Sequence, residues 1–541
     1  MGYRFYFGAS GVGKTYRAFK DIIDEAVKNL DKKFFIIVPE QFTMQTQKDI
    51  VQMHPNHAVN NIDVLSFNRL AYRIFEELDI ENPEVLDELD KALILRRIAN
   101  KVELKAWKKQ FQKAGFIDSI KSLISEFMQY DISDDFIREQ VNNSEVDSLL
   151  KIKLEDIYNL KTGFEEYIAG KYFTNEQILD VLNENIANSE LLRDSVILFD
   201  GYTGFTPIQN RIISNLMKVA AELRFSVTLG KGVNPDIRLL ESDLFFISGK
   251  MISQINEMAN KENIKRLPDI NLNMGAVHRF KNSKDLEFFE EHFLRYDGKK
   301  SKEVSDIEIN YCMNPLDEID FVANNILSLV KDNDYRYRDI AIIYGDLEDV
   351  SDALINRFHQ LEVPYYLDEK MDVDNNELVE FINACIGVIS ENFSYDAVNR
   401  FLRLGLLHFD KRLVSLLDNY LLETGIKGYK RLHSEFTYLP KSFSETELKE
   451  INDFKDFALC KLDTLYTAIS KSKVSIKSAL GAFREIFTKE NIEEKLEDIK
   501  LSLEEKGDFK RAREYEGIFD EVISLFDRLE LVLEGESLTK K

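Results

Sequence analysis

The sequence predicts an α/β fold in which a parallel sheet is covered by helices and interrupted by large helical insertions. Over the first eighty residues, short apolar strands alternate with amphipathic helices, a pattern typical of strands joined by helical crossovers. From about residue 82 to 189 the chain has helical periodicity and no strand pattern. The strand pattern then returns at residues 195–199 and again at 224–229. The chain therefore leaves the sheet, forms a helical insertion and comes back.

Length and composition indicate a soluble protein of several domains. The 541 residues suffice for roughly three or four domains. Hydrophobic residues make up 44% and charged residues 31%, as in globular proteins with sizeable cores. No apolar run approaches the length of a membrane span, and the first residues form a strand pattern instead of a secretory signal. We therefore expect a cytoplasmic protein with no membrane partner.

Charge and cysteine content exclude several classes. The net charge of −24 disfavours a general polyanion binder, so a nucleic acid would need a local groove. Cys312, Cys385 and Cys460 lie more than seventy residues apart, which gives neither a local metal site nor a disulfide framework. We expect all three cysteines to lie in hydrophobic cores.

The strongest motif lies near the start of the chain, where residues 8–15 follow the pattern G-x-x-x-x-G-K-T. A strand pattern at 3–7 precedes it and a helical pattern at 16–30 follows, which is the context of a phosphate-binding Walker A loop. Glycines let backbone N–H groups surround a phosphate, and the helix dipole favours the same anion. Lys14 would reach the β- and γ-phosphates of ATP, and Thr15 would ligate Mg²⁺. The predicted cofactor-binding residues are Gly8, Ala9, Ser10, Gly11, Val12, Gly13, Lys14 and Thr15.

A second magnesium ligand is predicted at Asp200, which ends the strand at 195–199. A hydrolytic motor also needs a carboxylate that activates water. Here Gly201 follows the aspartate, and no acid occurs between Gly201 and Arg211. We therefore assign no catalytic residue and expect nucleotide binding without efficient hydrolysis.

Other polar residues allow two interpretations. Gln41 follows the strand predicted at 34–38, and Ser66 lies at the end of the strand predicted at 61–67. Both are at the edge of the sheet where Lys14 lies. They could contact phosphate or DNA, or they could only cap their loops. The basic segment at 101–113 contains Trp107 and Phe111. It could bind a DNA strand, but we favour a solvated helix with its two aromatic residues packed inward.

A second α/β unit is predicted after a polar stretch near residues 296–303. Its strand patterns lie at 307–312, 337–344 and 363–367, so its sheet is incomplete. From about 376 to 533 the pattern is helical again.

These features together resemble superfamily 1 helicases of the UvrD type and, more narrowly, the B-subunit family of the AddAB ATP-dependent helicase/deoxyribonucleases. The first matching stretch is the phosphate loop, a widespread motif; the order and combination of the stretches are specific. The further matches are FIIVPEQ at 35–41, VLSFNRLA at 64–71, FDGYTGFTP at 199–207, YRYRDIAI at 335–342 and VPYYLD at 363–368.

The resemblance implies a domain plan. Residues 1–81 and 190–296 would form a first RecA-like P-loop domain (1A), and 82–189 a helical insertion (1B). Residues 303–375 would begin a second RecA-like domain (2A), and 376–541 would form a helical insertion like 2B. The family's C-terminal nuclease domain, with a 4Fe-4S cluster on four cysteines, has no counterpart in these residues. We therefore expect an amino-terminal fragment of such a protein.

Departures from active relatives fall on hydrolysis and base reading. Active relatives carry Asp-Glu at Asp200-Gly201 and Gln-Asp at Thr203-Gly204, although Gln209 keeps a further glutamine that could contact DNA or phosphate. They also carry an adenine-reading glutamine before the phosphate loop, and often an arginine at the position of Gly345. The resemblance therefore implies a motor that has lost its activity.

The function implied is that of the B subunit in a heterodimeric helicase and exonuclease, which processes double-strand DNA ends for recombination and repair. The partner A subunit would drive translocation, while the B subunit would guide single-stranded DNA. Two alternatives remain open. The protein could be a self-sufficient superfamily 1 helicase, or a non-enzymatic DNA-handling scaffold with a vestigial phosphate loop.

Overall fold

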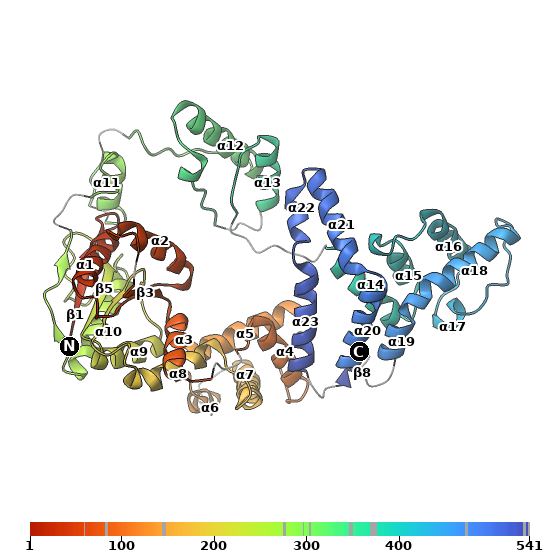
Figure 1. Cartoon of the computed structure of the whole chain (residues 1–541), viewed down its shortest axis with the longest axis horizontal. Helices are drawn as coiled ribbons and strands as arrows, with labels where there is room; N and C mark the ends of the chain where they lie inside the picture. Colours follow the sequence, from red (N-terminus) through yellow and green to blue (C-terminus); the bar gives the residue numbers. More distant parts are fainter. Residues whose placement is uncertain are drawn as a thin grey trace. The chain divides into compact units, whose positions relative to one another are not determined.

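The computed structural model contains two compact units, Met1–Tyr311 and Cys312–Lys541, which are described separately (Figure 1). The structure describes residues 1–58, 60–81, 85–142, 148–273, 277–295, 297–301, 304–345, 350–367, 376–470, 474–533 and 537–538.

A parallel sheet organises the first unit. Its strand order is β3-β2-β4-β5-β1-β6, and β7 also pairs with β1. The five longer strands confirm the predicted sheet, whereas β6 and β7 were not predicted because two residues carry no periodic pattern. The strands are β1 (Gly2–Gly8), β2 (Phe34–Ile37), β3 (Ile62–Leu65), β4 (Val196–Phe199), β5 (Glu222–Thr228), β6 (Lys265–Arg266) and β7 (Ile270–Asn271).

Helices cover both faces of this sheet, as the predicted α/β fold requires. Alternate strand residues such as Phe5 and Ile36 point to opposite faces and belong to separate cores. Figure 1 shows α1 and α2 on one side of the sheet and α9 on the other. One core takes α1 (Lys14–Lys28) and α2 (Thr43–Met53); the other takes α3 (Phe67–Glu77), α8 (Asn175–Asn185), α9 (Pro207–Val219) and α10 (Phe246–Lys261).

An ion network lies under α1, inside the sheet layer. Arg224 of β5 is only 2% exposed. Its Nη2 donates to both carboxylate oxygens of Glu25 on α1, at 2.7 and 2.8 Å, and to Glu222 at 3.0 Å. Burial acts to raise the pKa of Glu222, but Arg224 and Arg4 outweigh it and hold that pKa below its usual value. The network therefore ties the helix that follows the phosphate loop to β5.

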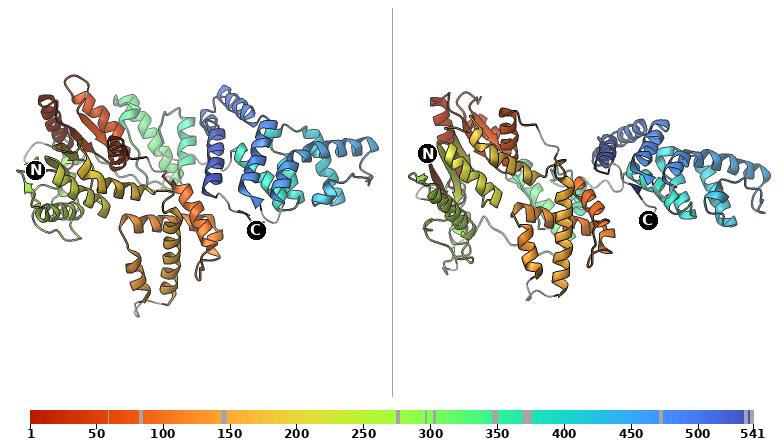
Figure 2. Two further views of the ribbon diagram at one scale, coloured as in Figure 1. Left: turned by 60° about the horizontal axis from the view of Figure 1, so that its bottom comes forward. Right: turned by 90° about the horizontal axis from the view of Figure 1, so that it is seen from below.

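The chain leaves and rejoins the sheet region at one place, where a bridge pairs Val85 with Phe173. Between these residues the described chain forms helices joined by turns, and Figure 2 shows the helices packed side by side as an orange bundle. They are α4 (Glu88–Ala99), α5 (Ala114–Gln129), α6 (Asp134–Asn142) and α7 (Ser148–Ile168).

The basic segment at 101–113 is a series of turns, so the helix expected there was wrong. The carboxylate of Asp156, fully buried on α7, accepts the backbone N–H groups of Lys105, Ala106 and Trp107 at 2.8, 2.8 and 3.0 Å. Backbone N–H groups that donate to one carboxylate are not available for the backbone hydrogen bonds of a helix, so this segment forms turns instead. The inward packing of the aromatic residues is confirmed, because Phe111 is buried and Trp107 packs edge-on against Phe116.

Replacing Asp156 with alanine should destabilise the first unit by about 2–3 kcal/mol, because three backbone N–H groups lose the buried, charged carboxylate that accepts them. The matched control is Glu155→Ala, which removes only an exposed pair with Lys105 and should cost less than about 1 kcal/mol. Urea unfolding followed by circular dichroism measures both. Equal losses in the two variants would show that the carboxylate does not hold the turn.

The three strands predicted between residues 307 and 367 were wrong. Among the described residues these segments have no strand partner, and a 3₁₀ turn, Tyr337–Asp339, interrupts the second of them. Tyr311 and Ile343 are 96% and 95% exposed. Apolar alternation indicates which residues suit a strand, but a strand forms only when a neighbour takes its backbone hydrogen bonds. Within this stretch α12 (Pro315–Asp332) and α13 (Ser351–Gln360) pack around a small core.

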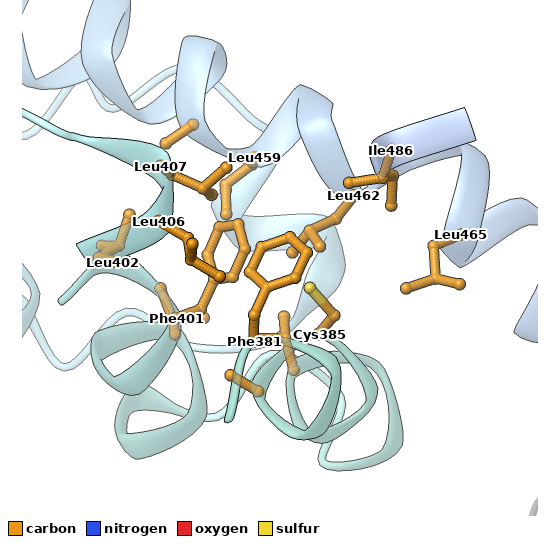
Figure 3. Packing of buried hydrophobic residues seen from close by; sticks show 14 of the residues in the cluster. Phe381, Cys385, Phe401, Leu402, Leu406, Leu407, Leu459, Leu462, Leu465 and Ile486 are labelled. Carbon is orange, nitrogen blue, oxygen red and sulfur yellow. The ribbon is translucent and has the colours of Figure 1, made fainter. Parts of the chain in front are cut away.

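Residues 376–533 form the predicted helical region around one hydrophobic core. Figure 3 shows Phe381, Phe401 and Cys385 pointing into it. Cys385 is fully buried, and burial raises the pKa of its thiol, but Cys460 is exposed, so the expectation that all three cysteines lie in cores was wrong. The helices are α14 (Glu377–Ser390), α15 (Tyr395–Leu402), α16 (Lys411–Thr424), α17 (Tyr429–Leu432), α18 (Glu445–Leu459), α19 (Asp463–Ile469), α20 (Ile476–Lys489), α21 (Ile492–Glu505), α22 (Phe509–Glu514) and α23 (Ile518–Val532).

In the part of the chain that the structure describes, no helix is both long enough and apolar enough to cross a bilayer.

Candidate nucleotide-binding site

The phosphate loop joins β1 directly to α1, as the motif requires. Gly13 caps α1 with φ +90°, and Gly11 has φ +82°, both in the left-handed region that favours glycine. A Cβ at Gly11 would also come within 2.6 Å of the Cβ of Arg279. These two glycines are therefore required by the backbone of the loop and by its close neighbour.

Lys14 lies in the first turn of α1, with its side chain folded back over the loop. Its Nζ donates to the carbonyl oxygen of Ala9 at 3.0 Å. Burial lowers the pKa of Lys14, while the charge of Asp200 acts in the opposite direction and Arg279 lowers the pKa further. The ammonium is thus partly desolvated, a state in which a phosphate would interact with it strongly.

The two predicted magnesium ligands lie together. Thr15 Oγ1 donates to the Asp200 carboxylate, with distances of 3.0 and 3.2 Å to its two oxygens. Burial raises the pKa of Asp200, and hydrogen bonds from Ser226 and Thr15 and the Lys14 charge oppose that rise. Among the residues described, no group of three or more His, Cys, Asp or Glu side chains is arranged so that it could hold a metal ion by itself. A hydroxyl and one carboxylate suit Mg²⁺, which usually keeps waters and phosphate oxygens as its other ligands.

Gly201 follows the aspartate with φ +80° and gives its N–H to Asp200. A Cβ at this position would lie 3.3 Å from Cδ of Pro39. An acidic side chain here would therefore meet both backbone strain and a close contact. The backbone at the position after the aspartate is shaped for glycine.

Three residues of this site were missed from the sequence. Arg279 donates from its backbone N–H to the Gly11 carbonyl at 3.2 Å and from Nη1 to Ser10 Oγ at 3.0 Å. Asn273 accepts the Ala9 N–H, and Ser226 donates to Asp200. For Ser226 a signal existed, because it is one of the alternate polar residues within an apolar strand. Asn273 and Arg279 lie more than 260 positions from the loop, beyond any spacing rule.

A hollow of about 310 Å³, separate from the phosphate loop, lies at the ends of β2 and β3. Ser66 and Gln209 both line it. Each also caps a helix: Ser66 accepts the Arg69 N–H of α3, and Gln209 accepts the Thr206 N–H of α9. The capping role that the sequence allowed for Ser66 is therefore confirmed; Gln209 caps a helix as well, and the two residues share one cavity. Gln41 lies in the 3₁₀ turn η1 (Glu40–Phe42), exposed and outside the residues that line the hollow.

A short helix, α11 (Lys284–His292), follows Arg279; burial lowers the pKa of Lys14, and the charge of Glu290 on this helix is one of the charges that oppose that lowering. On the same helix, the buried Asp285 accepts the backbone N–H groups of Ser305 and Asp306 at 2.6 and 3.1 Å. These bonds hold the pKa of Asp285 below its usual value. The segment that leaves the first unit is thus fastened to the helix beside the phosphate loop.

This fastening should depend on pH. The folded pKa of Asp285 is lower than the unfolded pKa of about 3.8, so its stabilisation is present above that value and is lost as pH falls through the folded pKa. The difference in unfolding free energy between the wild type and Asp285→Ala should therefore shrink below about pH 4. Urea unfolding between pH 7 and pH 3 measures it. Glu287→Ala, an exposed change on the same helix, should show no such trend.

A strand, a phosphate loop, a helix that begins at it and a strand-end aspartate facing the loop's threonine place the chain in the class of P-loop folds. A family model described as ADDB, N-terminal matches residues 5–290. The chain belongs to this AddB N-terminal family.

Curated relatives are named as the B subunit of an ATP-dependent helicase/deoxyribonuclease. Those from Lachnoclostridium phytofermentans, Clostridium tetani and Alkaliphilus metalliredigens are 34%, 31% and 31% identical to the chain. In each case the match covers 100% of this chain and 48% of the relative. The chain therefore spans about half the length of the curated relatives it matches.

Proposed function

We propose that the chain is the nucleotide- and DNA-binding part of the B subunit of a heterodimeric, cytoplasmic ATP-dependent helicase and exonuclease. Together with the A subunit, it would process double-strand DNA ends for recombinational repair. Support comes from the relatives' names and from full-chain similarity to them. The observation that carries the nucleotide role is the pairing of Thr15 with Asp200 beside Lys14 at the mouth of the phosphate loop.

In this proposal the loop Gly8–Thr15 holds the phosphates of ATP, and Thr15 and Asp200 hold Mg²⁺. Bound magnesium would screen the phosphate charge and orient the β- and γ-phosphates. Lys14 supplies a desolvated ammonium, and the exposed guanidinium of Arg279 adds a second cation beside Ser10. The loop would therefore discriminate nucleotides by their phosphate chain.

The same site would bind ATP without efficient hydrolysis. Hydrolysis needs a base that activates water next to the γ-phosphate. The position after Asp200 is Gly201, with φ +80° and Pro39 close by, so an acid cannot occupy it without strain. This observation supports a motor that has lost its activity over the alternative of a self-sufficient helicase.

We also propose the domain plan of the resemblance. A RecA-like domain would comprise residues 1–81 and 190–296, with the helical insertion at 82–189. Residues 303–375 would begin a second RecA-like domain, with the helical region 376–541 as its insertion. The nuclease activity and its iron–sulfur cluster would belong to a part of the protein beyond these residues.

Single-stranded DNA would lie over the hollow at the ends of β2 and β3. Ser66 and Gln209 offer polar atoms there, while the half-buried Tyr202 offers a ring for base stacking. Glu40 and Glu176 line the same hollow and would repel phosphates, so bases fit it better than backbone. Gln41, on the adjacent turn, would contact the strand from outside.

A test uses the full-length B subunit, first in isolation and then in complex with its partner. Calorimetric titration with Mg-ATP should give saturable binding to the isolated protein, whereas ATP turnover on blunt duplex DNA should require the heterodimer. Strong DNA-stimulated hydrolysis by the isolated protein, lost in Lys14→Ala, would instead establish the self-sufficient helicase. The absence of heat at millimolar Mg-ATP would favour the scaffold with a vestigial loop.

A further inference from the structure

Asn273, just after β7, connects two strand ends at the phosphate loop. Its Oδ1 accepts the backbone N–H of Ala9 at 2.7 Å, and its Nδ2 donates to the carbonyl oxygen of Leu229 at 3.0 Å. Ala9 is the first residue of the loop after β1, and Leu229 follows β5. One amide side chain therefore joins the loop to the neighbouring strand.

Sheet geometry explains why this contact is needed. The last ladder bonds to β1 run from Leu229 N to Gly8 O at 3.0 Å and from Leu272 N to Phe7 O at 2.8 Å. Beyond Gly8 the chain turns out of the sheet, and the N–H of Ala9, a residue only 5% exposed, has no strand to meet. An unpaired N–H buried there would be costly. The amide of Asn273 supplies the missing acceptor and so fixes the direction in which the loop departs.

The carbonyl group of Ala9 holds the side chain of Lys14. The carbonyl oxygen of Ala9 accepts the Lys14 ammonium at 3.0 Å. Ala9 is thus held by Asn273 through its N–H and presents its C=O to Lys14. A rotation of Ala9 would carry the lysine's anchor with it.

We propose that Asn273 is a positioning residue of the nucleotide site, which places the Lys14 ammonium for the phosphate chain by fixing Ala9. This proposal rests on the proposed nucleotide function. It extends the site beyond the motif to a side chain 264 positions away. Asn273 itself need not touch the nucleotide, since it acts through Ala9.

Two variants of the full-length protein give a matched comparison. Asn273→Ala removes both hydrogen bonds. Asn452→Ala removes a similar pair of hydrogen bonds in the second compact unit. There Asn452 accepts the Phe436 N–H at 2.9 Å and donates to the Phe436 carbonyl at 3.0 Å. In calorimetric titration, Asn273→Ala should bind Mg-ATP about tenfold more weakly, and Asn452→Ala should bind like wild type.

A second readout needs no nucleotide. Brief acetylation followed by mass spectrometry measures the reactivity of Lys14 relative to Lys20, an exposed lysine on the same helix. Loss of the anchor should raise the Lys14-to-Lys20 ratio severalfold in Asn273→Ala and not in Asn452→Ala. Asn273→Asp keeps an acceptor for the Ala9 N–H, so its ratio should stay near that of wild type. A purely structural role would lower stability without moving this ratio.

The outcomes separate the two proposals. If wild type binds no Mg-ATP but the Lys14 ratio rises in Asn273→Ala, the nucleotide function fails and the coupling of Asn273 to Lys14 stands. If wild type binds Mg-ATP, and Asn273→Ala matches it in both affinity and ratio, the positioning role is overturned. If Asn273→Ala does not fold, an Asn273→Asp ratio that rises severalfold would equally overturn it.

Discussion

Arg224→Ala is expected to lower the unfolding free energy of the first unit by about 3–5 kcal/mol, the usual cost of breaking a buried ion pair. Arg224 is 2% exposed and bonds Glu25 and Glu222 at once. Removing it leaves Glu222 beside Arg4 alone and releases Glu25 of α1 from β5. Urea unfolding followed by circular dichroism measures the loss.

Two further variants test the cause. Arg17→Ala removes an exposed pair with Asp21 on the same helix and should cost less than about 0.5 kcal/mol. The double variant Arg224→Met with Glu222→Leu replaces the charges by apolar groups, and it should recover part of the stability lost in Arg224→Ala. A loss below about 1 kcal/mol in Arg224→Ala itself would mean that the network contributes little.

Lys14→Ala is expected to weaken Mg-ATP binding by roughly two to three orders of magnitude, since truncating one partner of a desolvated charge pair costs about 2–5 kcal/mol. Burial already lowers the pKa of Lys14, so the site is one in which a phosphate would find little competing water. Equilibrium titration calorimetry on the full-length protein measures the change in Kd.

The control for this change is Lys20→Ala, which removes an exposed ammonium from the same helix six residues further on. Its Kd for Mg-ATP should match that of wild type, and both variants should unfold at similar urea concentrations. Unchanged binding in Lys14→Ala would place the nucleotide away from the phosphate loop and would remove the basis of the nucleotide proposal.

The core of the first sheet could be predicted because β1, β2 and β4 are short apolar runs buried on both faces. Residues such as Ile36 and Phe199 need no distant information to be recognised as strand residues. The strands expected between 307 and 367 have the same local pattern, and yet Ile343 is 95% exposed. Pairing depends on partners elsewhere in a chain, which a local pattern does not contain. Local preference was thus sufficient for the long strands of the first sheet and for the helices after residue 376, and insufficient for the stretch between 307 and 367.

The residues of the candidate site likewise fall into two groups: those that a local pattern predicts and those that only the folded sheet brings together. Lys14 and Thr15 belong to one local motif, and Asp200 was found because aspartates that follow parallel strands reach the same sheet edge. Asn273 and Arg279 come from a segment whose strand, β7, is two residues long, and only the folded sheet brings them to the loop. Similarly, the turn held by Asp156 could not be predicted, because its acceptor lies about fifty residues from its donors.

The strand order has a consequence for synthesis on the ribosome. β1 is made before all of its neighbours, because they are β5, β6 and β7, none of which begins before Glu222. At about 5–20 residues per second, the strand that carries the phosphate loop waits roughly 10 to 40 seconds for its first partner. Meanwhile β2 and β3 can pair with each other, and the helices of 85–168 can form from local contacts. The apolar β1 therefore stays unpaired while β2 and β3 form, and the nucleotide site is among the last parts of the first unit to be completed.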